Sequence, residues 1–304
     1  MSGRDFGYVI QSSAALWNRL STFSQRGKAL DTRLADIKKA LGKPYYETSD
    51  VLLYHGDSLE LLKSMPQQIF DLTVTSPPYN IGKEYEGVLS IEEYISWCET
   101  WMSRVHRATS AGGAFWLNVG YVPVPNQGKA VPIPYLLWDK SPFYMIQEVV
   151  WNYGAGVASR KSFSPRNEKF LWYVRDPLNY YFDLDSVRDP NVKYPNQKKN
   201  GKLKCNPLGK NPTDVWQFPK VTSGAKRSSV ERTAHPAQFP SAVIERVIKA
   251  CSPSDGVILD PFLGSGTTSL TARKQGRCSV GIEIREDYLD IAVGRLEAEA
   301  QSLF

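Results

Sequence analysis

Short apolar runs rich in β-branched and aromatic residues recur along the chain, and Gly, Pro or Asp residues bound most of them. Runs of this length and composition are typical of strands. We predict strands over residues 51–54, 69–74, 114–119, 145–151, 170–174, 257–259 and 279–284.

Helical periodicity separates several of these runs. The clearest helix begins after Ser90, because Ser90 and Glu93 fit a capping box and the following apolar residues trace one helical face. Further helices are predicted from about Pro240 and over residues 270–274 and 286–300. The alternation predicts an α/β fold with a Rossmann-like, doubly wound and mostly parallel sheet.

Two segments, 1–48 and 176–232, do not alternate between predicted strands and helices. The chain is therefore divided into four parts: 1–48, 49–175, 176–232 and 233–304. Residues 1–48 form a predicted helical arm, since Leu30, Leu34, Ile37 and Leu41 recur at helical spacing. The arm can pack on the domain, join two subunits or contact a ligand. Residues 176–232 are rich in Pro, Asn, Lys and Gly, which predicts an insert with long loops.

The positive charge of the chain is concentrated in this insert. The whole sequence has a formal net charge of +6, and residues 186–232 contain eleven Lys or Arg against three Asp or Glu. The remainder is therefore about neutral. Such a concentration favours contact with phosphates, and a solvated basic loop is the alternative.

Composition excludes several classes of protein. The hydrophobic fraction of 42% is sufficient for a folded core. The four cysteines are scattered without a CxxC pair, so we expect no metal site, no disulfide framework and a reduced, cytoplasmic setting. No stretch approaches a membrane span, and the first residues do not resemble a secretory signal.

A glycine-rich loop, DPFLGSGTT at Asp260–Thr268, follows one predicted strand and opens a helix. Its glycines allow a ligand close to the backbone, and amides at the helix start face an anion such as a pyrophosphate or an amino-acid carboxylate. Glu283 lies 23 positions after Asp260, where an acid can bind ribose hydroxyls. The loop lacks the lysine of a P-loop. A tight turn without a ligand is the alternative.

A second candidate loop, Thr75-Ser76-Pro77-Pro78-Tyr79, follows another predicted strand. Ligands bind at the carboxyl ends of strands in open α/β sheets. The two prolines hold the backbone extended, so that carbonyls can accept N–H bonds from an aromatic amine while Tyr79 stacks on its ring. A proline-stiffened turn beside a core tyrosine is the alternative.

Together the SPPY and DPFLGSGTT motifs resemble the amino-methyltransferase family of DNA methyltransferases. Their order, with the catalytic motif before the cofactor motif, resembles the permuted β group. The resemblance spans roughly residues 51–300 and includes Gly56-Asp57-Ser58 and the HPxxxP segment that begins at His235.

This resemblance implies S-adenosylmethionine as cofactor. Asp57 and Phe262 would contact its adenine, Asp260 its amine, and Thr267 with Thr268 its carboxylate. The implied catalytic residues are Ser76, Pro77, Pro78 and Tyr79. The implied cofactor-binding residues are Asp57, His235, Pro236, Gln238, Asp260, Pro261, Phe262, Gly264, Ser265, Gly266, Thr267, Thr268 and Glu283.

The implied reaction is methyl transfer to the exocyclic N4 of a cytosine flipped out of double-stranded DNA. Ser76 favours cytosine, because Asp or Asn at this motif position usually accompanies adenine in the family. Adenine N6 is the first alternative; an RNA or small-amine methyltransferase and a non-catalytic DNA-binding module are the others. Cytosine C5 chemistry is excluded, since it requires a nucleophilic cysteine on the catalytic loop.

Basic residues in and near the insert are predicted to line the DNA cleft, with residues 176–232 as target-recognition region. These are Arg160, Lys161, Arg166, Lys193, Lys198, Lys199, Lys202, Lys204, Lys226 and Arg227. Residues 49–175 and 233–304 would form the catalytic and cofactor-binding parts. The resemblance implies a bacterial or phage origin. It also allows a partner restriction endonuclease, and the protein can be a monomer or a homodimer. The hypothesis requires both loops to lie on one rim of the sheet.

Overall fold

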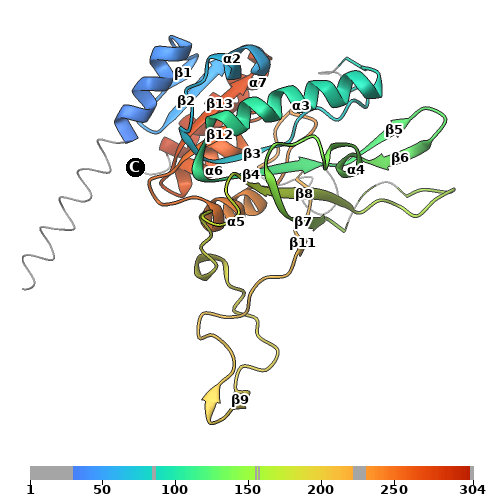
Figure 1. Ribbon diagram of the computed structural model, residues 1–304, viewed down its shortest axis with the longest axis vertical. Coiled ribbons are helices and arrows are strands. Elements are labelled where there is room, and N and C mark those ends of the chain that lie inside the picture. Colours follow the sequence, from blue (N-terminus) through green and yellow to red (C-terminus); the bar gives the residue numbers. More distant parts are fainter. Residues whose placement is uncertain (1–29, 84–86, 155, 157, 222–230, 302–304) are drawn as a thin grey trace, which may run out of the picture.

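The computed structural model describes residues 30–83, 87–154, 156, 158–221 and 231–301. A nine-stranded sheet runs through the molecule in the order β1-β2-β13-β12-β3-β4-β8-β7-β11 (Figure 1). Helices cover both of its faces. The predicted doubly wound, mostly parallel sheet is confirmed.

Five neighbouring strands in the middle of the sheet are parallel, so their carboxyl ends meet at one edge. They are β2 (Val51–His55), β13 (Cys278–Glu283), β12 (Val257–Asp260), β3 (Phe70–Thr75) and β4 (Thr109–Val119). The strand order does not follow the sequence, because β12 and β13 from the end of the chain insert between β2 and β3.

The remaining strands extend the sheet on either side. β1 (Tyr46–Glu47) pairs antiparallel with β2. On the other side, β8 (Asn167–Val174) is antiparallel between β4 and β7 (Tyr144–Asn152), and β11 (Val215–Gln217) is parallel to β7. The amino end of β8 therefore lies at the same edge as the carboxyl ends of β4, β7 and β11.

Each face of the sheet has its own helices and its own core. A helix over residues 30–41, α2 (Ser58–Ser64), α3 (Ile91–Ala108) and α4 (Ile133–Leu137) pack on one face. The opposite face is covered by α5 (Ser241–Cys251), α6 (Thr267–Lys274) and α7 (Glu286–Gln301). Burial of these apolar faces accounts for most of the stability of such helices.

The local signals at α3 predict its start correctly. The Ser90 hydroxyl accepts from the Glu93 amide, and the Glu93 carboxylate accepts from the Ser90 amide, which completes the capping box. Elements that the sequence pattern does not predict are α2, α4, the short helix η1 (Asp185–Val187), the hairpin of β5 (Tyr121–Val124) and β6 (Gly128–Pro132), and the short strands β1, β9 (Lys198–Lys199), β10 (Lys202–Leu203) and β11.

The two segments without strand–helix alternation, 1–48 and 176–232, each contain described residues that pack on the sheet or belong to it. Leu34 and Ile37 are buried in the core, so residues 30–48 pack on the domain, whereas residues 1–29 lie outside the described residues. Trp216 of β11 is buried too. The part that extends away from the domain carries β9 (Lys198–Lys199) and β10 (Lys202–Leu203) (Figure 1).

Candidate active site

The proline-stiffened loop and the glycine-rich loop meet at the carboxyl ends of two adjacent parallel strands. β3 ends at Thr75 and β12 ends at Asp260, and the Thr75 hydroxyl donates to Asp260 Oδ1 over 2.7 Å. Residues of both loops line one cavity of about 400 Å³. The structure therefore brings the two motifs to the same rim of the sheet.

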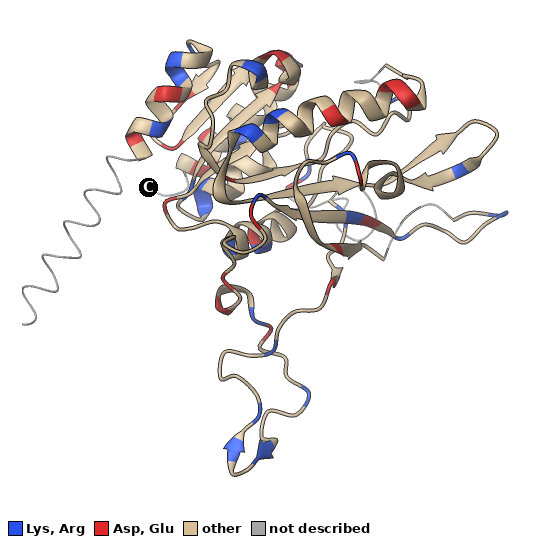
Figure 2. Ribbon diagram, viewed as in Figure 1, with Lys and Arg blue, Asp and Glu red and all other residues tan. Residues whose placement is uncertain are grey.

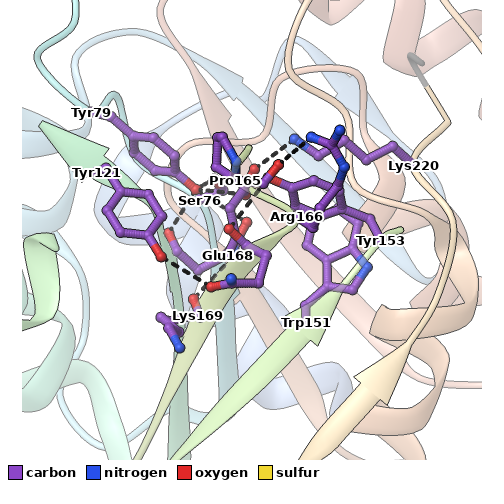
Figure 3. Close-up of polar contacts among 12 residues, drawn as sticks. Ser76, Tyr79, Tyr121, Trp151, Tyr153, Pro165, Arg166, Glu168, Lys169 and Lys220 are labelled. Atoms are coloured by element: carbon purple, nitrogen blue, oxygen red, sulfur yellow. Dashed lines mark hydrogen bonds and ion pairs between the residues drawn. The ribbon is translucent and has the colours of Figure 1, made fainter. Parts of the chain in front are cut away.

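Hydrogen bonds hold the SPPY loop from several sides. Ser76 Oγ lies 3.0 Å from the Tyr79 hydroxyl, which also lies 3.2 Å from Asn118 Oδ1 (Figure 3). The Tyr94 hydroxyl donates to the Pro78 carbonyl over 3.0 Å. Ser76, Pro77, Pro78 and Tyr79 all line the cavity. The loop thus presents a hydroxyl and an aromatic ring on a fixed backbone.

The glycine-rich loop is fastened to the next strand. The Gly264 amide donates to Glu283 Oε2 over 2.8 Å, and the Arg285 amide donates to Glu283 Oε1 over 3.0 Å. Gly264 has φ +54°, and a Cβ there would lie 2.9 Å from His235 Nε2. Burial raises the pKa of Glu283. Only a glycine leaves the room that this turn needs.

Three predicted cofactor residues do not line the cavity: Asp260, Gly266 and Thr268. The Asp260 carboxylate is fully buried and accepts from Thr75, from the Phe262 amide and from the Thr268 hydroxyl, the last over 2.6 Å. Burial raises its pKa to about 6. Asp260 and Thr268 thus join the two loops, and their contacts with the cofactor stay a prediction.

Gly266 also has a structural reason to be glycine. It has φ +75° at the start of α6, and a Cβ there would lie 2.6 Å from the Cβ of Ala292 in α7. Its lack of a side chain permits close packing of α6 against α7, and its place among the cofactor residues stays a prediction.

The other predicted cofactor residues do line the cavity: Asp57, His235, Pro236, Gln238, Pro261, Phe262, Gly264, Ser265, Thr267 and Glu283. Asp57 also caps α2 by accepting from the Leu59 amide over 2.6 Å. Phe262 packs against Trp97 and Trp101, with ring centroids 5.4 and 5.3 Å away. Burial lowers the pKa of His235 to about 4, so its ring is neutral at pH 7.

These residues fit an adenosyl group that carries a carboxylate. Asp57 and Glu283 supply acceptors for ribose or amine donors, and Phe262 supplies an aromatic wall. Arg295 places a positive charge next to the glycine-rich loop. Its Nη1 donates to the Ser265 carbonyl over 2.5 Å and to the Thr267 hydroxyl over 3.0 Å. Its guanidinium favours an anion at this end of the cavity.

Sequence reasoning missed several residues at the site. Asn118 is the last residue but one of β4, the strand next to β3, and it lines the cavity. Trp151, Glu168 and Lys220 line the cavity from β7, from β8 and from the end of the basic segment. Lys220 carries no local signal that distinguishes it from the lysines around it.

The predicted DNA-binding residues that the structure describes are not among those that line the cavity. Arg160, Lys161 and Arg166 are in the connection from β7 to β8, and the lysines from Lys193 to Lys204 are in the extended part of residues 176–232 (Figure 2). Lys226 and Arg227 lie outside the described residues. Within the described ranges, no helix is both long and apolar enough to cross a membrane.

Comparison with known proteins gives one consistent family. A family model described as DNA methylase, of the N6/N4 methyltransferases, matches residues 70–294. The type II methyltransferase M.BglII of Bacillus subtilis is 35% identical over 255 residues, which cover 81% of this chain and 69% of that protein. The DNA adenine methyltransferase YhdJ of Escherichia coli K12 is 32% identical over 254 residues, with coverage of 81% and 82%.

Solved structures share the fold. The PvuII DNA methyltransferase, described as cytosine-N4-specific, superposes with a TM-score of 0.66 at 22% identity and covers 83% of this chain and 88% of its own. Other structures of this class I methyltransferase fold contain S-adenosylmethionine. The chain belongs to the N6/N4 DNA methylase family, whose members transfer methyl groups from S-adenosylmethionine to amino groups of DNA bases.

Proposed function

We propose that this protein methylates the exocyclic N4 of a cytosine that is flipped out of double-stranded DNA. The observation that carries the proposal is the shared cavity, which is lined by residues of both the Ser76–Tyr79 loop and the Gly264–Thr267 loop. One loop is suited to an aromatic amine and the other to an adenosyl cofactor.

The amine needs help from the protein because its lone pair is conjugated with the ring. We assign the Ser76 hydroxyl and the Pro77 carbonyl to accept its two N–H bonds, which directs the lone pair away from them. S-adenosylmethionine, when bound, supplies an electrophilic methyl group. Positioning and electrostatics then provide most of the rate, without a covalent enzyme intermediate.

The target base reaches the cavity only after it leaves the helical stack. We assign the ring of Tyr79 to stack on the flipped base. Its hydroxyl contacts Ser76 and Asn118, and a Cβ at Gly120 would lie 3.1 Å from the Tyr79 ring, so Gly120 leaves room for this ring position.

Cytosine is proposed on the strength of Ser76 and of the likeness to a cytosine-N4-specific enzyme. Adenine N6 is the second candidate, because YhdJ is named a DNA adenine methyltransferase. The deciding experiment incubates the full-length protein with S-adenosylmethionine and DNA from a methylation-deficient host, and identifies the methylated nucleosides by mass. N4-methylcytosine supports the proposal; N6-methyladenine alone, 5-methylcytosine or no product overturns it.

The relatives support a wider setting for this reaction. M.BglII is named a type II methyltransferase, which favours a modification enzyme that works beside a restriction endonuclease in a bacterial cytoplasm. We assign the lysines of the extended segment and the basic β7–β8 connection to the DNA backbone, since exposed cations suit phosphate contacts.

A further inference from the structure

A charged pair, Lys220 and Glu168, lines the cavity together with the SPPY loop. Lys220 Nζ lies 2.8 Å from Glu168 Oε1, and both side chains line the cavity with Ser76 and Tyr79. Only 23% of the Lys220 side chain and 17% of the Glu168 side chain are exposed. Figure 3 shows the two residues next to the SPPY loop.

The sheet places Lys220 there. β11 continues its pairing with β7, because the Phe218 amide donates to the Asn152 carbonyl and the Trp151 indole donates to the Phe218 carbonyl over 2.7 Å. Lys220 follows two residues later at the carboxyl end of β11. It is therefore directed into the cavity, unlike the exposed lysines that precede it in the sequence.

Three groups around the ammonium keep it charged and in place. Its Nζ lies 3.9 Å from the centroid of the Tyr153 ring and 5.9 Å from that of Trp151. Burial lowers the pKa of Lys220, but Glu168 and Tyr153 raise it by more, so the pKa lies above its usual value. The ammonium has three N–H donors, so it can keep its bond to Glu168 and also donate to a base.

We infer that Lys220 donates a hydrogen bond to the O2 atom of the flipped cytosine and, with Glu168 as its anchor, determines which base the enzyme accepts. This inference rests on the proposed function. When Ser76 holds the amine, the ring position two atoms away from the amine-bearing carbon is assigned to Lys220, which lines the same cavity near the SPPY loop. Cytosine has a carbonyl oxygen at that position.

Adenine has only a C–H group at the equivalent position of its ring. An adenine in the same pose would leave the half-buried ammonium of Lys220 against an apolar edge. A donor that loses water without gaining an acceptor is costly, and sites built around a hydrogen bond discriminate strongly against ligands that lack the partner. Lys220 therefore selects cytosine, whereas the amine held by Ser76 and Pro77 and the ring face on which Tyr79 stacks are features that both bases share.

The test compares Lys220→Met with wild type and with Lys169→Met as matched control. Lys169 follows Glu168 in β8, pairs with Glu148 over 3.2 Å and is likewise mostly buried, but it does not line the cavity. Each full-length protein is given S-adenosylmethionine and DNA from a methylation-deficient host, and N4-methylcytosine and N6-methyladenine are quantified by mass. Titration with S-adenosylmethionine and thermal unfolding report on the fold.

We expect Lys220→Met to lower the rate of N4-methylcytosine formation at least about 30-fold, as expected for loss of a charged hydrogen bond. Its affinity for S-adenosylmethionine should stay within twofold of wild type, and any N6-methyladenine should not fall in parallel. Lys220→Arg, which keeps a charged donor, should recover part of the rate. Lys169→Met should behave as wild type.

A Lys220→Met enzyme that forms N4-methylcytosine within threefold of the wild-type rate overturns the inference and leaves the proposed function intact. Wild-type protein that forms no N4-methylcytosine overturns both, and this result is visible without any variant. If Lys220→Met does not fold, Lys220→Leu, which also lacks a donor, compared with Lys220→Arg serves instead. Equal rates for those two variants then overturn the inference.

Discussion

At the scale of single residues, the Asp260 carboxylate connects the two loops of the active site. It accepts hydrogen bonds from Thr75 of β3 and from Thr268 of α6, and it is 1% exposed. A buried carboxylate with no cationic partner among these contacts is costly to ionise. The position of the SPPY loop relative to the glycine loop therefore depends on a group whose charge opposes folding.

This cost predicts a characteristic pH dependence. Burial raises the pKa of Asp260 from 3.8 to about 6, so its contribution to stability is complete below pH 3.8 and is lost as the pH rises through about 6. This rise in the pKa of Asp260 corresponds to about 3 kcal/mol. Asp260→Asn removes the titration, so the free energy of unfolding of wild type should fall relative to the variant between pH 4 and 6.

Urea denaturation of both proteins at pH 4, 5, 6 and 7 measures this difference. Asp50→Asn provides a control of opposite sign. Burial raises the pKa of Asp50, but bonds from Arg273 and Thr48 lower it by more, so its pKa lies below 3.8 and its contribution is present at neutral pH. Parallel pH profiles for wild type and Asp260→Asn would contradict the assigned pKa.

Tyr79 allows the ring and the hydroxyl to be separated. Tyr79→Phe removes the contacts with Ser76 and Asn118 but keeps the ring, whereas Tyr79→Ala also removes the surface on which a flipped base stacks. We expect a fall in methylation of about 10-fold for Tyr79→Phe and more than about 100-fold for Tyr79→Ala. Isothermal titration should show unchanged affinity for S-adenosylmethionine in both; loss of that affinity would contradict the stacking role.

At the scale of the elements, local sequence patterns predict strands, loops and helix starts, but not which side chains from distant elements meet. The strand–loop–helix pattern around Gly264 and the capping box at Ser90 depend on neighbours in sequence, so both were predictable. Glu168 and Lys220 come together only because β8 and β11 flank β7, and β11 has just three residues. No periodicity in so short a strand reveals its pairing.

Asp260 is a second case in which a local pattern does not reveal contacts between distant elements, although it begins the DPFLGSGTT motif. The sequence places its carboxylate at the end of a strand beside a ligand loop, and it cannot show that Thr75 and Thr268 occupy both oxygens. The direction of a side chain at a strand end depends on the neighbouring strand, which here comes from the other half of the chain.

The extended segment provides a prediction for an element as a whole. Changing Lys198, Lys199, Lys202 and Lys204 to Gln removes four exposed cations from β9, β10 and the following turn. Each lost phosphate contact reduces the slope of log K against log salt by about 0.9, so the slope should decrease by up to about 4. Fluorescence anisotropy of labelled duplex DNA between 50 and about 200 mM salt measures it.

Lys249→Gln with Lys274→Gln is the control for this experiment. Both lysines lie in the last turns of α5 and α6, at the edge of the sheet opposite the cavity, and both already pair with glutamates. The control should retain the wild-type slope. An unchanged slope in the fourfold variant would place the DNA contacts on another surface.

At the scale of the whole molecule, the active site belongs to no single part of the chain. Asp57 and Ser76 come from its first third, whereas His235 and Glu283 come from its last third, yet all four line one cavity. Because β12 and β13 lie between β2 and β3, neither part completes the central sheet alone. A ligand in the cavity therefore stabilises the assembled sheet rather than one segment of it.

Binding of S-adenosylmethionine should consequently shift the entire unfolding transition. At a concentration one hundred times its dissociation constant, a ligand adds about 2.7 kcal/mol of stability, which corresponds to about 4 °C for a chain of this length. Calorimetry should show one transition that moves as a unit.

Gly264→Ala should abolish the ligand-induced shift of this transition, because its Cβ would meet His235 at 2.9 Å in the cavity wall. Gly276→Ala is matched to it, since Gly276 also has a positive φ, of +69°, but has no atom within 4 Å of the added Cβ. Both variants should lose stability through backbone strain, and only Gly276→Ala should retain the response to the ligand. A ligand shift confined to part of the transition, or an equal shift in both variants, would show that the cofactor does not bind across the two halves of the sheet.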